Sequence, residues 1–478
     1  MRTFLNRRAG AWTAGALLAL AACSPERVVS DAKLPSGVAD PTLLHNASGA
    51  VAAYHASLVA FRKAFNNTVA ISGLLTDELQ SGAVGQPITL WDFRADVDSR
   101  SIPELTDPNA SLPSSDGQIP AYFYLQTVRG QVQEAKGLLA DFGGDTVQAL
   151  AGHSDAIEGY ADVLLADLYC SGIPLSTLDY DGDYTLASGS TTADVYERAV
   201  ALFDSALTLA ADSARVMNLA RVGKGRALLA LGRYADAALA VADVPDDFAY
   251  QVLFTTGDTI ASFANQSAAD AGMGPWRYTT TDREGINGLD YRSSRDPRVA
   301  AVAIGANRYG QTIYHPTKYN ATGTTPIVLA SGIEARLIEA EAALVAGSAS
   351  WLTTLNALRT DGTFDTQPSD TNPAVTDTLW HAGAGGVAGL APLADPGTPD
   401  ARVDLLFRER AFWLYLTGQR QGDLRRLIRQ YGRTPAQVYP TGPYPGASGL
   451  YSGDVTIPVP AAERAFNSKY TGCINRGA

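Results

Sequence analysis

The chain has no excess of positive charge, and this shortage limits what it can bind. Its 478 residues carry 37 Lys and Arg against 49 Asp and Glu, which gives a net charge of −12 with histidine neutral. Binding to the phosphates of a nucleic acid requires clustered Lys and Arg, so we expect no DNA or RNA partner. The 46% of hydrophobic residues is typical of a globular protein rather than a disordered one.

Sequence motifs for metal, phosphate or nucleophile chemistry are missing. The five histidines are scattered without the spacing of a zinc site, and no G-x-S-x-G element marks a hydrolase nucleophile. The segment RVGKG at 221–225 lacks the first glycine and the Ser or Thr of a phosphate loop. We therefore predict no metal, no cofactor and no catalytic residue.

Three aspartates alternate in LDYDGDYT like the start of a calcium-binding loop. They are Asp179, Asp181 and Asp183. The loop glycine stands at the wrong place, and the twelfth position is Ser190 rather than Glu. A solvated acidic turn is the simpler interpretation, and a calcium site of another kind stays open.

A basic and then apolar segment begins the chain. Three arginines within the first eight residues precede an apolar run over 9–22, which is short for a membrane span and typical of an export signal. The run ends in Leu-Ala-Ala-Cys, which resembles a bacterial lipobox with Cys23 as the lipidated first residue. We predict a signal peptide over 1–22, a lipidated tether over 23–40, and acyl chains as the only membrane anchor. The alternative is an ordinary secretory signal followed by a chance cysteine.

Cysteine is scarce, because Cys170 and Cys473 are the only ones besides Cys23. Export places both in an oxidising compartment, where an even number of cysteines favours a disulfide. Such a bridge would attach the C-terminal end to the middle of the chain. Two buried free thiols are the alternative.

Helical periodicity covers most of the remaining chain. Apolar residues recur at three- or four-residue steps over 41–80, 120–142, 146–170, 193–211, 215–231, 327–346 and 349–359, and a further helical pair begins near Ala401. The pair at 193–231 carries the small residues Ala220, Gly223 and Ala227 near one face, which resembles the tetratricopeptide helix-turn-helix pattern. Because one such unit cannot bury its own apolar face, several must stack.

These patterns predict a mainly α fold. We expect degenerate tetratricopeptide-like helical repeats, an alpha–alpha superhelix, with an irregular, loop-rich subdomain. Stretches rich in Gly, Pro, Thr and aromatic residues interrupt the helices at about 81–119, 246–326 and 361–400, and we expect short strands in the second of these. The prediction is a single domain over 41–478.

Five short motifs occur in an order that resembles one known family. They are ADVLLADLYCSGIPLS at 161–176, RDPRV at 295–299, IEARLIEAEAAL at 333–344, an E-R, G-x-R, D-L-x-R skeleton at 409–426, and VTIPVPAAERAFN at 455–467. The skeleton consists of Glu409, Arg410, Gly418, Arg420, Asp423, Leu424 and Arg426. With the lipobox, these motifs resemble the SusD/RagB family of nutrient-binding outer-membrane lipoproteins. The chain departs from the family pattern at Trp413 and Thr417, where acids are usual.

The resemblance implies a binding protein without catalysis. It implies four degenerate tetratricopeptide pairs with an irregular, loop-rich ligand-binding subdomain. It also implies a SusC-like TonB-dependent transporter as partner and a lipid-anchored position at the outer membrane, facing the cell exterior. In that family the lipoprotein is a hinged lid that captures oligosaccharides or other nutrients for import. One alternative is a tetratricopeptide-like scaffold lipoprotein in envelope assembly, for which long aromatic loops are unexpected. The other is a secreted glycoside hydrolase, which needs only two carboxylates across a cleft.

Aromatic residues of the irregular regions are the candidate ligand contacts, because sugars stack their apolar faces on aromatic rings. The candidates are Trp91 with the nearby Arg94, and Trp276, Tyr278, Tyr291, Tyr309 and Tyr319. The alternative for each ring is packing beneath its own loop.

The segment FRERAFWLYLTGQRQGDLRRLIR at 407–429 combines charge with apolar bulk. The core-facing residues here are predicted to be Leu406, directly before the segment, and Phe412, Trp413 and Leu416 within it. Glu409, Arg420 and Asp423 are spaced to form ion pairs across the helix junction, which lies at Gly418. Since buried charge is tolerable only when it is paired, we expect this segment to stabilise the fold and to contact no ligand.

Overall fold

The computed structural model describes residues 41–81, 93–102, 121–144, 147–254, 278–306, 311–319, 325–360, 390–445 and 449–478. The predicted signal peptide and tether with Cys23 lie outside the described residues, as do Trp91, Trp276 and Tyr309. Within the described residues, no helix is long and apolar enough to span a membrane.

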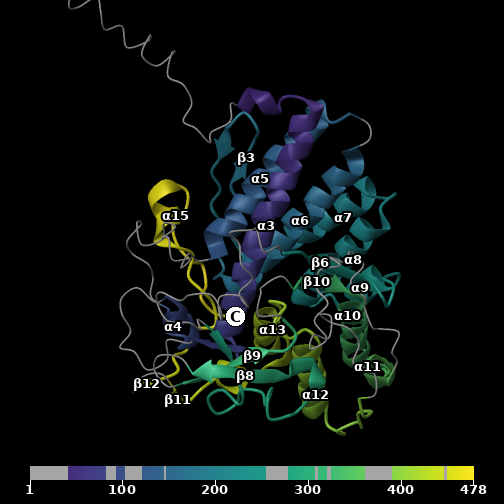
Figure 1. The fold of residues 1–478 in the computed structure, drawn as a ribbon, viewed down its shortest axis with the longest axis vertical. Helices are drawn as coiled ribbons and strands as arrows, with labels where there is room; N and C mark the ends of the chain where they lie inside the picture. The colour runs from purple at the N-terminus through teal and green to yellow at the C-terminus, as the bar shows by residue number, and fades with distance from the viewer. Residues whose placement is uncertain are drawn as a thin grey trace, which may run out of the picture.

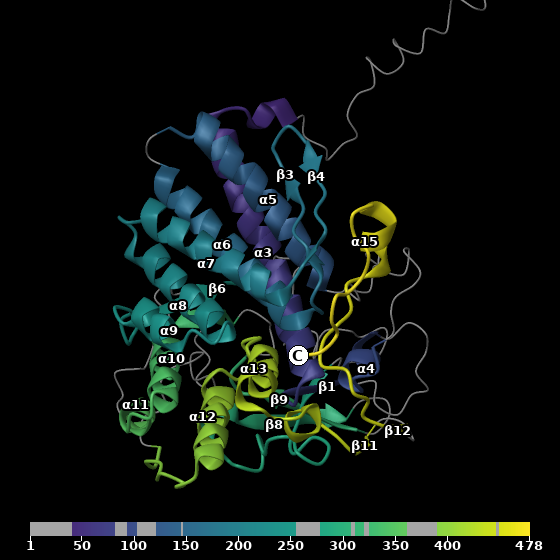
Figure 2. The same cartoon turned by 180° about the vertical axis from the view of Figure 1, so that it is seen from behind.

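Helices dominate the described chain, and consecutive helices pack side by side (Figures 1 and 2). The longer ones are α3 (Ala47–Leu75), α5 (Ala121–Phe142), α6 (Gln148–Leu168), α7 (Thr192–Leu209), α8 (Ala214–Ala230), α9 (Tyr234–Val241), α10 (Gly332–Val345), α11 (Ser350–Thr360), α12 (Pro399–Trp413) and α13 (Arg420–Tyr431). Contacts join α3 with α5, α6 with α7, α8 with α9, and α10 with α11. The prediction of a mainly α fold built from helical pairs is confirmed.

Small residues allow the helices of the predicted tetratricopeptide-like pair to approach closely. A Cβ atom added at Gly223 of α8 would lie 2.4 Å from Cζ of Phe203 on α7. The Phe203 ring also packs edge-on against Tyr160 of α6, with 5.2 Å between ring centroids. A glycine therefore makes the hole that a large ring fills, as the sequence pattern predicts.

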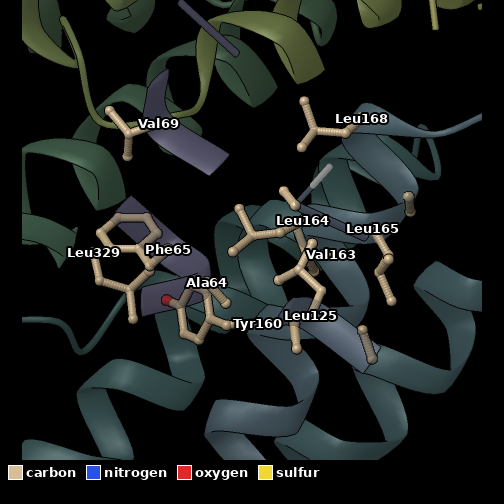
Figure 3. Close-up of a cluster of buried hydrophobic side chains, with 14 of the residues drawn as sticks. Ala64, Phe65, Val69, Leu125, Tyr160, Val163, Leu164, Leu165, Leu168 and Leu329 are labelled. Carbon is tan, nitrogen blue, oxygen red and sulfur yellow. The ribbon is translucent and has the colours of Figure 1, made fainter. Parts of the chain in front are cut away.

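The main core lies where α3, α5 and α6 meet. Figure 3 shows Phe65 of α3, Leu125 of α5 and Leu164 of α6 gathered with Leu329 from a neighbouring strand, and each is at most 1% exposed. Burial of a side chain of this size contributes about 1.5–3 kcal/mol relative to exposure. This core supports the irregular segments that carry the candidate site.

Local signals explain where the helices begin. The α7 helix starts after Thr191, whose side chain accepts from the amide of Asp194 while the Asp194 carboxylate accepts from the amide of Thr191. The helix predicted over 327–346 is wrong in its first five residues, which form the strand β10 (Ile327–Ser331). They pair with β6 (Ala249–Val252), a partner distant in sequence that overrides the helical pattern.

The strands form small two-stranded antiparallel ribbons. The other ribbons are β1 (Leu79–Ser81) with β7 (Tyr278–Thr280), β2 (Ile173–Pro174) with β5 (Gly189–Ser190), β3 (Thr177–Leu178) with β4 (Tyr184–Thr185), β8 (Ala301–Ala306) with β9 (Thr312–Pro316), and β11 (Pro443–Tyr444) with β12 (Gly449–Leu450). The short helices are η1 (Pro41–Leu44), α4 (Phe93–Asp98), η4 (Pro297–Val299), α14 (Pro435–Val438) and α15 (Ala461–Phe466). The described part of 246–326 contains short strands, as predicted.

A disulfide joins Cys170 to Cys473, with 5.9 Å between their Cα atoms. It lies beside two backbone bonds, from the amide of Ser171 to the carbonyl of Asn475 (2.9 Å) and from the amide of Ile474 to the carbonyl of Ser171 (2.7 Å). The C-terminal segment is therefore fixed to the end of α6, which is the connection that the cysteine count favours.

The arginine-rich segment at 407–429 forms the buried junction between α12 and α13. The predicted core residues Phe412, Trp413 and Leu416, and Leu406 directly before the segment, are all buried. The chain turns at Leu416 and Gly418, where φ is +54° and +82°. Leucine rarely adopts such a φ, and here two bonds hold it. Its amide donates to Glu78 Oε1, and its carbonyl accepts from the Tyr319 hydroxyl, both at 2.8 Å.

Two charged residues of this segment have partners that differ from the predicted ones. Arg420 binds Asp77, with Nε 2.7 Å from Oδ1 and Nη2 3.0 Å from Oδ2. Glu409 accepts from Arg298 and Arg359, each at 2.7 Å. The prediction that Glu409 and Arg420 pair across the junction is wrong, because the tight turn directs them toward segments distant in sequence.

Asp423 does pair across the junction. Its Oδ2 lies 2.8 Å from Nε of Arg410 on α12, and its Oδ1 lies 2.7 Å from Nη2 of Arg426 on α13. The carboxylate of Glu341 on α10 also accepts from Arg426. The two neighbouring guanidinium groups outweigh burial and lower the pKa of Asp423 to about 2.

Candidate ligand-binding site

The described residues that flank Trp91 and Trp276 lie side by side. Ser81 is the last described residue before the segment with Trp91, and Tyr278 is the first described residue after the segment with Trp276. In the β1–β7 ribbon, Ser81 and Tyr278 are register partners. Described residues close in sequence to two candidates that are 185 positions apart are therefore paired in one ribbon.

The described residue that follows the segment with Tyr309 lies near the same ribbon. Tyr309 belongs to the connection between β8 and β9, and Gln311 is the first described residue after it. The amide Nε2 of Gln311 donates to Oε1 of Gln80 on β1 at 3.2 Å. The backbone amide of Tyr314 on β9 donates to the hydroxyl of Thr279 on β7 at 3.0 Å. The β8–β9 ribbon is thus attached along β1–β7, at the lower end of the molecule in Figure 1.

The α4 helix, which contains Arg94, is attached to the same ribbon. Asp98 at its C-terminal end accepts from the backbone amide of Ser81 and from the hydroxyl of Tyr444, each at 2.8 Å to Oδ2. These bonds fix α4 between the end of β1 and β11. Arg94 therefore belongs to a helix next to the starting points of the three aromatic segments.

A pair of buried carboxyl groups stabilises this region. Glu284 hydrogen-bonds Asp98 and accepts from the Tyr451 hydroxyl at 2.7 Å, and both acids are at most 5% exposed. Burial and the Asp98 charge raise the pKa of Glu284 well above its usual value. One proton shared between the two carboxyl groups would satisfy both, as in other close acid pairs. This pair joins α4, the segment after β7 and the segment after β12.

Two of the predicted contacts, Tyr291 and Tyr319, are core residues. Both are 0% exposed. The Tyr291 ring packs against Phe412 and Tyr415, with centroids 5.5 and 4.8 Å away. The Tyr319 hydroxyl bonds the carbonyl of Leu416. Their position argues against a direct ligand contact and favours packing beneath the loops, the alternative that the sequence leaves open.

Tyr278 is half-buried and packs partly against the main core, so part of its side chain stays accessible at the ribbon. Sequence reasoning missed Tyr314, which is half-buried on β9, with the guanidinium carbon of Arg292 3.6 Å from its ring centroid. No motif marks this pair, because its members are 22 positions apart in the sequence. The ring and the charge offer a stacking surface and a hydrogen-bond donor at the same ribbon.

The region can bind a polar ligand that has apolar faces. Half-buried rings can stack on sugar faces, and Arg292 or backbone amides can donate to hydroxyl groups. Among the described residues, no cluster of three or more His, Cys, Asp and Glu side chains could hold a metal ion. The Asp179 turn is exposed, and its Oδ1 accepts from the amides of Asp181 (3.1 Å) and Asp183 (2.9 Å), as in a solvated acidic turn.

Comparison with known proteins identifies the fold. No family model matches the sequence, and no curated protein matches it. Solved structures do match. Surface glycan-binding protein A from Bacteroides thetaiotaomicron is 11% identical, with 90% of this chain and 99% of that chain covered at a TM-score of 0.59. A SusD-like carbohydrate binding protein from Bacteroides vulgatus is 14% identical, with coverage of 89% and 97% and a TM-score of 0.58. A laminarin binding SusD-like protein is 14% identical, with coverage of 89% and 99% and a TM-score of 0.55.

The chain has the SusD fold. The resemblance that the sequence motifs suggest is confirmed at the level of the fold, over about nine tenths of the chain. In this SusD-like chain the D-P-R motif has a structural role. Asp296 caps η4 and pairs with Arg298, which also binds Glu409 of the arginine-rich segment. The D-P-R motif and the arginine-rich segment therefore contact each other.

Proposed function

We propose that this SusD-like chain captures oligosaccharides at the cell surface and passes them to a SusC-like TonB-dependent transporter in the outer membrane, acting as a lid. The observation that carries the proposal is that the described residues flanking Trp91, Trp276 and Tyr309 meet at the β1–β7 ribbon, next to the α4 helix with Arg94. Loops on a rigid scaffold commonly carry binding sites. Structural neighbours named as glycan-binding and laminarin-binding proteins share this fold.

The ligand-binding test is titration calorimetry of the mature chain against a panel of oligosaccharides. We expect saturable binding to at least one glycan, and Trp276→Ala should weaken it by about tenfold or more, as for a buried aromatic anchor. Tyr184→Ala is the matched control. Its ring is 70% exposed on β4, at the opposite end of the molecule (Figure 2), so its loss should leave affinity unchanged. Equal affinity of wild type and Trp276→Ala would remove that residue from the site.

The anchoring and partner claims need a separate experiment. Cys23→Ala should release the protein from the membrane fraction, because the lipobox cysteine would carry the acyl chains. The wild-type lipoprotein should co-purify with a large barrel transporter from detergent-solubilised outer membranes. Co-purification with other envelope components instead, together with the absence of glycan binding, would favour the scaffold alternative. Turnover of polysaccharide by the purified chain would favour the hydrolase alternative.

A further inference from the structure

The guanidinium group of Arg292 lies over the ring of Tyr314, beside the β1–β7 ribbon. The guanidinium carbon is 3.6 Å from the ring centroid, so the two groups are in van der Waals contact. The Nε atom of Arg292 donates to the carbonyl of Thr281 at 3.4 Å. A guanidinium group that stacks on an aromatic ring keeps the nitrogen atoms at its edge available to acceptors. Arg292 is therefore oriented before any ligand arrives.

Both members of this pair are attached to β7. The backbone amide of Tyr314 donates to the hydroxyl of Thr279 at 3.0 Å, and its carbonyl accepts from the hydroxyl of Thr280 at 3.3 Å. Thr281, whose carbonyl holds Arg292, directly follows β7 in the chain. The pair thus belongs to the ribbon where the described residues that flank the three candidate aromatic residues meet.

The two Nη atoms of Arg292 are open to a ligand. Within the described residues, Arg292 forms its hydrogen bond to Thr281 and its contact with Tyr314, and no acid pairs with it. Neither Nη atom has a described partner, and neither is fully buried, so both face solvent. The side chain as a whole is half-buried. Partial burial lowers the local dielectric constant, so a charged acceptor would bind this group more strongly than a fully solvated one.

The acids near Arg292 in sequence are mostly neutralised by other groups. Residues 281–299 contain four arginines and four acids, which are Arg283, Arg292, Arg295 and Arg298 against Asp282, Glu284, Asp290 and Asp296. Glu284 shares a proton with Asp98, and its pKa is raised well above its usual value. Asp290 binds Arg408 of α12 at 2.6 Å, and Asp296 binds Arg298 at 2.7 Å. Three of the four acids are therefore protonated or paired.

The remaining charges of this segment leave a positive balance. Asp282 has no ion pair with a described residue, and its Oδ1 accepts from the amide (2.9 Å) and the hydroxyl (3.1 Å) of Ser293. Arg295 is exposed and, like Arg292, has no ion pair with a described acid. Two arginines thus stand against one carboxylate that is already hydrogen-bonded.

We propose that the captured oligosaccharide is acidic, and that the two Nη atoms of Arg292 bind the carboxylate of one of its uronate rings. The parallel N–H groups of a guanidinium match the two oxygens of a carboxylate, which gives strength and orientation together. A neutral sugar offers hydroxyl groups instead, and hydrogen bonds to uncharged groups are weaker. Tyr314 is a positioning residue that fixes the plane of the guanidinium group. This inference rests on the proposed function, because it names the ligand class of the same site.

Titration calorimetry of the mature chain at low ionic strength tests the inference. The probes are short oligomers of galacturonate, mannuronate and glucuronate, together with neutral laminarin oligomers. Each uronate oligomer is compared with its carboxyl-reduced form, in which hydroxymethyl groups replace the carboxylates. At least one uronate oligomer should bind about tenfold or more tightly than its reduced form. Added salt should weaken that binding, because it screens the charge of the pair.

Substitutions at the pair separate its two roles. Arg292→Gln should reduce the preference for the uronate form to within about twofold, and Arg292→Lys should keep part of it, because the charge remains while the bidentate geometry is lost. Tyr314→Ala should lower the preference, whereas Tyr314→Phe, which keeps the ring, should leave it unchanged. Arg283→Gln is the matched control. It removes the same charge from the same segment, but its side chain is 69% exposed and 3.8 Å from Asp290, so the preference should persist.

The outcomes distinguish this inference from the proposed function. Binding of neutral or carboxyl-reduced oligomers as tightly as the uronate forms would overturn the inference and leave the proposed function standing. An unchanged preference in Arg292→Gln would overturn it as well. The absence of binding by every acidic and neutral oligomer would count against both. Thermal melting checks that each variant is folded, and Arg292→Lys keeps the test decisive if the glutamine variant unfolds.

Discussion

Replacing Asp423 by alanine should destabilise the protein strongly while leaving its ligand affinity unchanged. The Asp423 carboxylate is 4% exposed and lies between the guanidinium groups of Arg410 and Arg426. It connects α12 to α13 at the junction where the chain turns. Glu341 alone would remain to balance two buried positive charges, and its carboxylate is already 3.8 Å from Arg410 and bonded to Arg426.

Two estimates bound the magnitude. Removing one partner of a buried ion pair costs about 3–5 kcal/mol, because the remaining charge is left uncompensated. The pKa of Asp423 falls from 3.8 to about 2, and this shift corresponds to about 2 kcal/mol of stability. The second estimate is smaller because a protonated carboxyl still fills the site and keeps part of its hydrogen bonding. Since the folded pKa is lowered, this contribution is present above pH 3.8 and is lost as pH falls through about 2.

Urea denaturation at pH 7, followed by circular dichroism, measures the difference in unfolding free energy. We expect Asp423→Ala to lose about 3–5 kcal/mol, and Asp423→Asn to lose less because it keeps one acceptor. The control is Asp395→Ala, since Asp395 pairs with Arg402 on the surface and should cost at most about 1 kcal/mol. A loss below about 1 kcal/mol for Asp423→Ala would refute the argument that this junction depends on paired buried charge.

Three further predictions concern other parts of the fold. Glu284→Gln should flatten the pH dependence of stability. The pKa of Glu284 is raised above 4.5, so its protonated form stabilises the fold below that pH, and this contribution is lost as pH rises through the raised pKa. Equal pH slopes of the urea midpoints would contradict it. Gly223→Ala should cost about 1–3 kcal/mol by collision with Phe203, whereas Gly453→Ala, with open space around its Cα, should cost little, and similar melting temperatures for both would argue against close packing. Cys473→Ser should cost about 2–5 kcal/mol of stability, because it removes the disulfide with Cys170. Addition of a reductant should lower the wild-type melting temperature to that of the variant. An unchanged wild-type melting temperature in reductant would show that the disulfide does not stabilise the protein.

The helices could be predicted from the sequence because their signal is local. Apolar periodicity located α5, α6, α7, α8 and α11 to within a few residues. The same signal failed at 327–331, where pairing with β6 decides the structure. A strand whose partner lies about 75 residues earlier leaves no trace in a local window.

The partners of the buried charges could not be predicted in the same way. The sequence indicates that Glu409, Arg420 and Asp423 must be paired, because they lie in a helical pair with core-facing residues and buried charge is tolerable only when it is paired. Their actual partners depend on the tight turn at Leu416, which has a positive φ. Leucine rarely adopts a positive φ, so the sequence does not predict this turn. Tyr319 illustrates the same limit, since its residue type and loop position fit a ligand contact, yet it bonds the carbonyl of Leu416.

Hydrogen–deuterium exchange with and without a bound oligosaccharide tests the central claim most directly, because it locates the ligand without substitutions. The account predicts slower exchange in peptides that cover 76–98, 275–292 and 306–316, the segments that meet at the β1–β7 ribbon, and unchanged exchange in the β3–β4 hairpin at 177–185. Protection confined to other parts of the molecule would contradict the proposed binding site.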